Sequence, residues 1–144
     1  MSKRHPHRML LVVEDYVNLK ALAHLLDLIS RDIYITFLHV VEFPISTSIY
    51  PETVTPYLEE AKKRFDNLID WAKSQGVNAD LKVVASRSII EAVLMEADRD
   101  EYDLIVLQKA VKKMRRRISE LFHRTSLERL VDKSRHVIII LPTN

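Results

Sequence analysis

The residues best suited to chemistry in this chain are basic, and they follow a short apolar run near its C-terminus. Residues 103–108 (DLIVLQ) have the composition of a buried strand. Six basic side chains occur in the next nine residues: Lys109, Lys112, Lys113, Arg115, Arg116 and Arg117. Thr125 then begins a capping box with Glu128, which predicts a helix start. Because α/β proteins hold phosphates between a strand end and a helix N-terminus, this stretch predicts an anion site.

The basic segment 109–117 has a second interpretation that needs no ligand. On a helical wheel, the apolar side chains that follow share one face: Met114, Ile118, Leu121 and Phe122. The basic side chains point away from them, as in an ordinary amphipathic helix with a solvated face. Residues 103–135 carry a net charge of +6, whereas residues 9–102 carry −7. This asymmetry indicates an anionic partner or an oriented self-contact, and the solvated face remains the alternative.

The composition excludes several kinds of site. Gly76 is the only glycine, so the chain lacks the glycine-rich loops of Walker-type and dinucleotide-binding proteins. It has no cysteine, and no two of its six histidines have the i, i+4 spacing of a zinc site. Ser126 lies near His123 in sequence, but no acidic partner completes a triad. We therefore expect no metal, no catalytic residue and no enzyme. Nucleic-acid binding is not favoured either, because aromatic residues do not alternate with the basic ones.

Apolar runs alternate with segments of helical period along the chain. This pattern predicts an α/β fold with a single open, five-stranded, mostly parallel sheet that carries helices on both faces. Strands are expected at residues 8–13, 33–41, 77–85, 104–107 and 137–141. Helices are expected at residues 18–29, 57–74, 88–100, 114–122 and 126–133. The proline-containing residues 42–55 are expected to form a loop, and Gly76 to end the helix before it.

The length of 144 residues suits one domain, so residues 1–144 are expected to fold as a single unit with a frayed N-terminus at residues 1–7. The apolar run at residues 9–13 is too short for a signal peptide, and no other run approaches the length of a membrane span. We therefore expect a cytoplasmic protein without a membrane segment.

Several short motifs occur in a characteristic order. They are Val13-Glu14-Asp15 after the first strand, FLHVVE at residues 37–42, DLIVL at residues 103–107, SLERLV at residues 126–131 and VIIIL at residues 137–141. Taken together, they resemble the universal stress protein family over residues 8–142. The resemblance implies the strand order 3-2-1-4-5, with a ligand crevice between the carboxyl ends of strands 1 and 4.

The nucleotide-binding members of that family carry an acidic residue after strand 1, and G-x-x-G, about nine residues and G-[ST] after strand 4. By position, the resemblance implies that the acidic residue is Glu14 and that the strand 2 backbone that meets the adenine lies at Val40 or Val41. The three glycines are replaced, by Gln108, Val111 and, before the [ST] residue, Arg124. The Cβ atoms at these positions occupy the space in which backbone amides approach phosphates. The candidate residues for a nucleotide or anion are Glu14, Val41, Gln108, Lys109, Lys112, Arg124 and Thr125.

The resemblance and the missing glycines lead to two functional hypotheses. The first is a non-enzymatic regulatory or stress-response protein that acts by binding, without ATP in the usual mode and without a cofactor. The second is a nucleotide or anion sensor that holds phosphate, from ATP or another nucleotide, with basic side chains such as Lys109 and Arg124. Both allow a protein partner or an anionic ligand at residues 109–117. A homodimer is expected through the last strand, from His136 to Leu141, because this apolar sheet edge needs covering.

Overall fold

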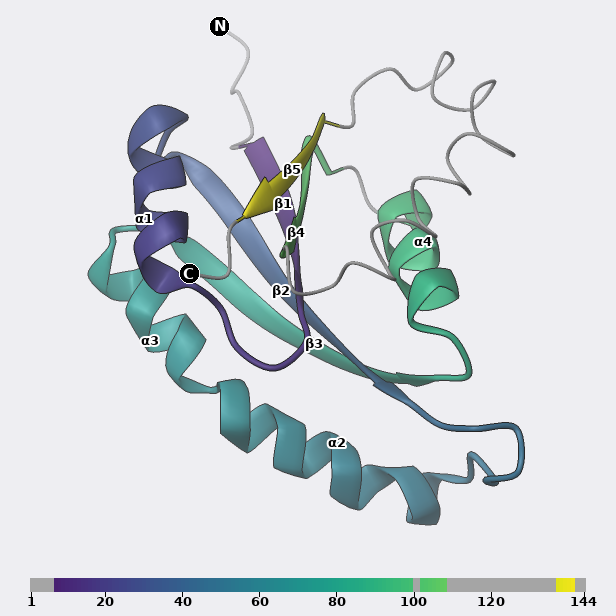
Figure 1. Cartoon of the computed structure of the whole chain (residues 1–144). Coiled ribbons are helices and arrows are strands. Elements are labelled where there is room, and N and C mark those ends of the chain that lie inside the picture. The colour runs from purple at the N-terminus through teal and green to yellow at the C-terminus, as the bar shows by residue number, and fades with distance from the viewer. Residues whose placement is uncertain (1–6, 100–101, 109–136, 142–144) are drawn as a thin grey trace, which may run out of the picture.

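The computed structural model describes residues 7–99, 102–108 and 137–141. These residues form one five-stranded sheet of order β3-β2-β1-β4-β5, in which every pair is parallel (Figure 1). The strands are β1 (His7–Val13), β2 (Ile33–Glu42), β3 (Asn78–Ser86), β4 (Leu104–Gln108) and β5 (Val137–Leu141). The α/β fold and the strand order predicted from the sequence are confirmed.

The described residues also form four helices that cover the sheet: α1 (Leu19–Leu28), α2 (Pro51–Phe65), α3 (Asn67–Ser74) and α4 (Ile89–Arg99). Figure 1 shows α1, α2 and α3 on one side of the sheet and α4 on the other. This division follows from right-handed crossovers, because the chain runs from β1 through β2 to β3 in one direction and then returns to β4 on the far side of β1.

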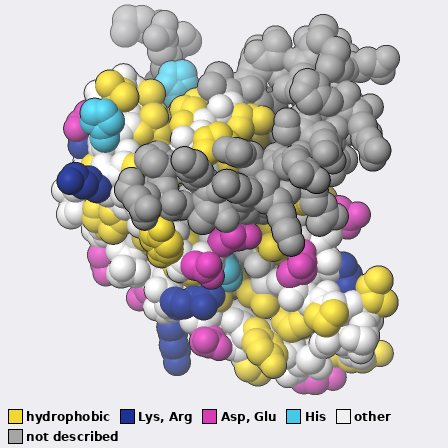
Figure 2. Space-filling model, viewed as in Figure 1, with side chains coloured by type: hydrophobic (Ala, Val, Ile, Leu, Met, Phe, Trp, Pro, Cys, Tyr) yellow, Lys and Arg dark blue, Asp and Glu magenta, His cyan; other side chains and the backbone are white. Residues whose placement is uncertain are grey.

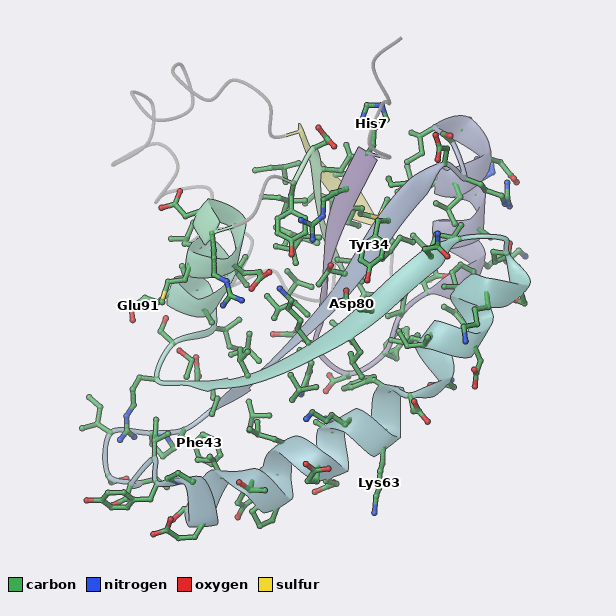
Figure 3. The ribbon with its side chains drawn as sticks, turned by 180° about the vertical axis from the view of Figure 1, so that it is seen from behind. His7, Tyr34, Phe43, Lys63, Asp80 and Glu91 are labelled. Atoms are coloured by element: carbon green, nitrogen blue, oxygen red, sulfur yellow. The ribbon has the colours of Figure 1, made fainter. Side chains whose placement is uncertain are left out.

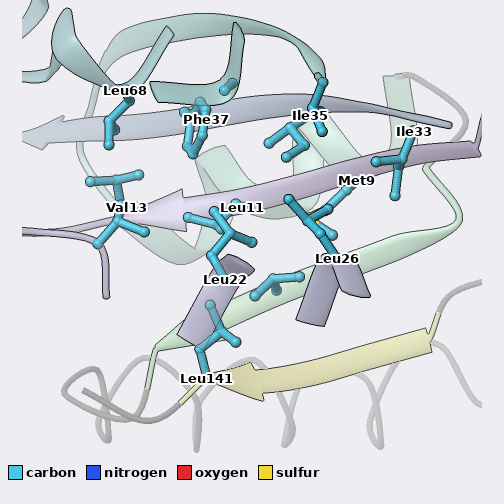
Figure 4. Packing of buried hydrophobic residues seen from close by; sticks show 14 of the residues in the cluster. Met9, Leu11, Val13, Leu22, Leu26, Ile33, Ile35, Phe37, Leu68 and Leu141 are labelled. Atoms are coloured by element: carbon cyan, nitrogen blue, oxygen red, sulfur yellow. The ribbon is translucent and has the colours of Figure 1, made fainter. Parts of the chain in front are cut away.

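The central strand β1 is buried on both faces. Met9, Leu11 and Val13 pack into the cluster under α1 and α3, whereas Leu10 and Val12 pack into the cluster under α4. None of the five is more than 1% exposed. Figure 4 shows the first cluster, to which the neighbouring strands and helices also contribute apolar side chains. The continuous apolar run at residues 9–13 is thus the sequence of a strand buried on both faces.

The boundaries of α2 and α3 correct the predicted loop at residues 42–55 and the predicted single helix at residues 57–74. Helix α2 begins at Pro51, because proline is well suited to the first helical turn, where its missing N–H leaves no bond unmade. Pro56 lies inside the same helix, on an exposed side. A turn at Asp66 divides the predicted helix, although this residue keeps helical dihedrals (φ −58°, ψ −35°).

Three of the described helix ends are capped, and the cap at Gly76 is the one predicted above. The Asn18 side chain accepts a hydrogen bond from Ala21 N at 3.1 Å and so caps α1. The Ser88 hydroxyl accepts one from Glu91 N at 3.3 Å at the start of α4. Gly76 has φ +75° after α3, with Gly76 N bonded to Lys73 O and Val77 N to Ala72 O. These two bonds form a Schellman motif, whose left-handed residue is most often glycine.

Some predictions fall partly or wholly outside the described residues. These are the helices at residues 114–122 and 126–133, the cap at Thr125 and the basic segment 109–117. Of the N-terminal residues predicted to be frayed, His7 belongs to β1 and pairs with Ile33. In the described part of the chain, no helix combines the length and the apolar character needed to cross a membrane.

Candidate functional site

The order of the strands defines where a ligand crevice belongs. The chain leaves β1 for α1 on one face, whereas α4, which leads into β4, lies on the opposite face. In open parallel sheets of this kind, ligands bind outside the carboxyl ends of the strands where the order reverses. Here that point lies between β1 and β4, which pair in parallel from Met9↔Leu104 to Leu11↔Val106. The residues that follow β1 and the last residue of β4 therefore form the described part of the site.

Gln108, the last residue of β4, is only 2% exposed and points its amide at the loop after β1. Its Nε2 donates a hydrogen bond to the backbone oxygen of Tyr16 at 2.5 Å. Its Oε1 accepts one from the backbone N–H of Asn18 at 3.3 Å. The nitrogen and the oxygen of the buried amide thus each have a hydrogen-bond partner in the loop, as a buried polar group requires.

The same loop is attached to β2 on its other side. His39 is 7% exposed, and its Nδ1 lies 2.8 Å from the backbone oxygen of Val13, the last residue of β1. Since a carbonyl oxygen can only accept, Nδ1 carries the proton. The loop between Val13 and Asn18 is therefore held from β4 by an amide and from β2 by an imidazole.

Carboxylates gather near this end of the sheet. Glu14 and Asp15 follow β1, and Glu42 ends β2. Burial raises the pKa of Glu14, and the negative charges of Asp15 and Glu42 raise it further. The Glu42 carboxylate also accepts a hydrogen bond from Ile89 N at 2.9 Å, at the positive end of the α4 dipole. Figure 2 shows several acidic side chains gathered near the middle of the face in view. The negative charge of these carboxylates repels a phosphate group and so disfavours its binding here.

The structure brings together only some of the predicted site residues. Glu14 and Gln108 both lie at the β1–β4 switch point, where the resemblance placed them. Val41 is half-buried in β2 and pairs with Ala85 on β3, one strand further from that point. The remaining four candidates lie outside the described residues: Lys109, Lys112, Arg124 and Thr125.

Neither the role of Gln108 nor the partners of His39 could be read from the sequence. Gln108 was expected at the ligand, whereas its amide bonds to the protein itself. His39 is a packed strand residue, only 7% exposed. Its second contact, with Arg64 on α2, carries no sequence signal, because a basic residue in the last turn of a surface helix has the pattern of solvated charge.

A second polar cluster lies on the α4 face of the sheet, away from the crevice. The buried Glu96 carboxylate accepts hydrogen bonds from Lys82 Nζ at 2.7 Å and from the Tyr102 hydroxyl at 2.6 Å. Burial alone would raise the pKa of Glu96, but these two hydrogen bonds lower it below its usual value. Tyr34 and Asp80 lie on the same face (Figure 3). The cluster joins α4 to β3, which is a structural role.

Among the described residues, no group of three or more His, Asp or Glu side chains could hold a metal ion. The described crevice therefore presents carboxylates, satisfied amides and a buried imidazole. Among the described contacts of these groups, no nucleophile lies beside a general base.

Solved structures similar to this one are universal stress proteins. One from Burkholderia pseudomallei matches with a TM-score of 0.61 at 18% identity, covering 99% of this chain and 100% of that one. One from Archaeoglobus fulgidus in complex with dAMP has a TM-score of 0.61 at 13% identity, covering 96% and 99%. One from Arabidopsis thaliana with AMP bound has a TM-score of 0.56 at 16% identity, covering 96% and 93%. No protein-family model matches the sequence, and a search of curated proteins finds no match. The chain therefore has the universal stress protein fold, as its motifs predicted.

Replacement of Gln108 by Ala tests the importance of its buried amide. The variant removes the hydrogen bonds of Gln108 with Tyr16 O and Asn18 N, so we expect the free energy of unfolding to fall by about 1–3 kcal/mol. Gln75→Ala is the matched control, because its side-chain contact with Arg31 is exposed, and a change within about 0.5 kcal/mol is expected. Urea denaturation measures both. Equal losses in the two variants would show that Gln108 does not fix the loop.

Proposed function

We propose that this chain, which has the universal stress protein fold, is a non-enzymatic regulatory or stress-response protein that acts by binding and does not bind ATP in the usual mode. The observation that carries the proposal is the position of Gln108. Its side chain is buried at the switch point, where the nucleotide-binding members of the family have glycine, and it bonds to the loop after β1.

Gln108 disfavours the binding of a nucleotide in two ways. First, its side chain occupies space that glycine leaves open for phosphate to approach the backbone. Second, its Oε1 already accepts the hydrogen bond of the backbone N–H of Asn18, so this N–H is not available to a phosphate oxygen. A ligand that took the N–H of Asn18 would leave the buried Oε1 of Gln108 without this hydrogen bond, which costs about 1–3 kcal/mol.

The charges of the described crevice support the same proposal. Glu14, Asp15 and Glu42 bring negative charge to the carboxyl ends of β1 and β2. The nucleoside phosphates are anions, and like charges at short range repel most strongly where burial limits screening. Binding of phosphate here requires positive charge from elsewhere in the chain.

The alternative is a nucleotide or anion sensor, in which the basic side chains of residues 109–124 supply that charge. It is favoured by the solved structures of the same fold that hold dAMP or AMP. In this hypothesis Lys109, Lys112 and Arg124 bind phosphate oxygens by charge-assisted hydrogen bonds, and Thr125 caps the helix that follows.

We also propose that the protein is a cytoplasmic homodimer that pairs through β5. Within the described residues, β5 is bonded to β4 alone, so its other edge has no strand partner there. Ile138 and Ile140 are 38% and 36% exposed. Edge strands with apolar side chains pair readily with another chain unless they are covered.

Thermal melting with and without millimolar Mg-ATP separates the two functional hypotheses. A ligand at 100 times its Kd adds about 2.7 kcal/mol, which for a domain of this size raises the melting temperature by roughly 10 °C. We expect no shift of that kind. A shift that persists at moderate salt and is lost in Lys109→Ala or Arg124→Ala would contradict the proposal and establish the sensor. A shift found only at low salt would indicate nonspecific attraction to the basic segment.

Lysine in place of Ile138 or Ile140 tests the dimer. Burying an ammonium group at an apolar interface is costly, so each variant is expected to weaken dimerisation by about tenfold or more. Leu28→Lys is the control, since Leu28 is 70% exposed on α1 and not on β5. Sedimentation equilibrium measures the dimer Kd. A monomeric parent protein, or equal dimerisation in all three variants, would exclude this interface.

A further inference from the structure

The buried imidazole of His39 has two polar contacts that together fix its protonation state. Nδ1 lies 2.8 Å from Val13 O, and Nε2 lies 3.3 Å from Arg64 Nη2. The carbonyl can only accept a hydrogen bond and the guanidinium can only donate one. His39 is therefore neutral, with its proton on Nδ1 and the lone pair of Nε2 directed at Arg64.

The contact between Arg64 and His39 joins two elements. Arg64 lies in the last turn of α2, and its guanidinium also lies over the ring of Phe65, 4.7 Å from the centroid. The ring centroids of Phe65 and His39 are 4.7 Å apart, and the ring planes meet at 48°. The end of α2 is thus packed against β2 beside the last residue of β1.

We propose that His39 and Arg64 form a pH-sensitive latch between α2 and the carboxyl ends of β1 and β2, which opens when His39 takes up a proton. Protonation places a hydrogen on Nε2, so that both groups become donors and both carry positive charge. The hydrogen bond then no longer exists, and the guanidinium moves from the imidazolium into solvent. Phe65 remains in the core, where it is 4% exposed, so the change is local.

Few charged groups act on this imidazole within the described residues. Burial lowers the pKa of His39, the hydrogen bond to Val13 raises it, Arg64 lowers it and Asp15 raises it. Arg64 comes from α2 and Asp15 from the loop after β1. On β3, the register partner of His39 is Val83, which does not ionise. The net effect is a pKa below the ordinary value of about 6.5.

The direction of this pKa change sets the pH range of the latch. Above about pH 6.5 the imidazole is neutral in both the folded and the unfolded chain. As the pH decreases below that value, the unfolded chain binds a proton first. The free energy of unfolding therefore decreases as the pH decreases, until His39 is also protonated in the folded protein. The latch is closed at neutral pH and opens on acidification, at the pKa of folded His39.

Opening affects the crevice because His39 and Arg64 lie beside it. A charged His39 still donates from Nδ1 to Val13 O, so the end of β1 stays attached to β2. The negative charge of Asp15, which already raises the pKa of His39, then acts on the imidazolium without the competing charge of Arg64. Acidification therefore reduces the net negative charge at the carboxyl ends of β1 and β2, and it frees one guanidinium at the edge of α2.

Histidine NMR over a pH titration of the full chain tests the latch. We expect the ¹⁵N shifts of His39 to show a protonated Nδ1 and an unprotonated Nε2 at pH 8, and its midpoint to lie below that of a free histidine. The side-chain resonances of Arg64 should shift with the same midpoint. In Arg64→Ala the midpoint of His39 should rise, because a neighbouring positive charge is lost.

Two variants distinguish the latch from a general charge effect. Lys63→Ala removes one positive charge from the adjacent, exposed position of α2 and should leave the midpoint of His39 unchanged (Figure 3). Arg64→Gln keeps a hydrogen-bond donor without the charge, and should give a midpoint between those of the parent protein and Arg64→Ala. The proposal is overturned if the midpoint of His39 does not respond to Arg64→Ala, if Lys63→Ala moves it equally, or if Arg64 does not sense the titration.

Discussion

The buried amide of Gln108 is the interaction on which the carboxyl end of this sheet depends. A primary amide removed from water must find partners for both its oxygen and its nitrogen, or the fold loses stability. Here both partners are backbone groups of the loop after β1, at Tyr16 and Asn18. Asn18 in turn caps α1. One side chain of β4 therefore holds the loop and the residue that caps α1.

His39 supplies the matching constraint from the opposite strand. Its imidazole bonds to the last carbonyl of β1, so neighbours on both sides hold the loop that follows. In the proposed function, this self-contained arrangement takes the place of a bound nucleotide. The loop is ordered by the protein's own neutral side chains, while the charged groups around it, Glu14, Asp15 and Glu42, oppose a phosphate. In the proposed latch, the contact of His39 with Arg64 on α2 depends on pH, whereas both attachments of the loop persist.

Much of the fold could be predicted from the sequence, because the signals are local. Residues 9–13 are apolar without alternation, as a strand buried on both faces requires, and Gly76 marks a left-handed cap. The start of α2 could not be predicted in this way, since Pro51 and Pro56 indicate a loop in most contexts and a first helical turn in a few. The roles of Gln108 and Arg64 could not be predicted either. Their partners are 90 and 25 residues away in sequence, and only the packed sheet brings them together.

The central claim is that Gln108 holds the loop after β1 in the ligand-free protein, and amide hydrogen exchange at Asn18 tests it most directly. The N–H of Asn18 is half-buried near the surface, and its acceptor is the side-chain oxygen of Gln108. The account predicts slow exchange without any ligand, no further slowing with Mg-ATP, and fast exchange in Gln108→Ala. Exchange at the rate of an unstructured chain, slowed only when nucleotide is added, would contradict it and show that the ligand orders this loop.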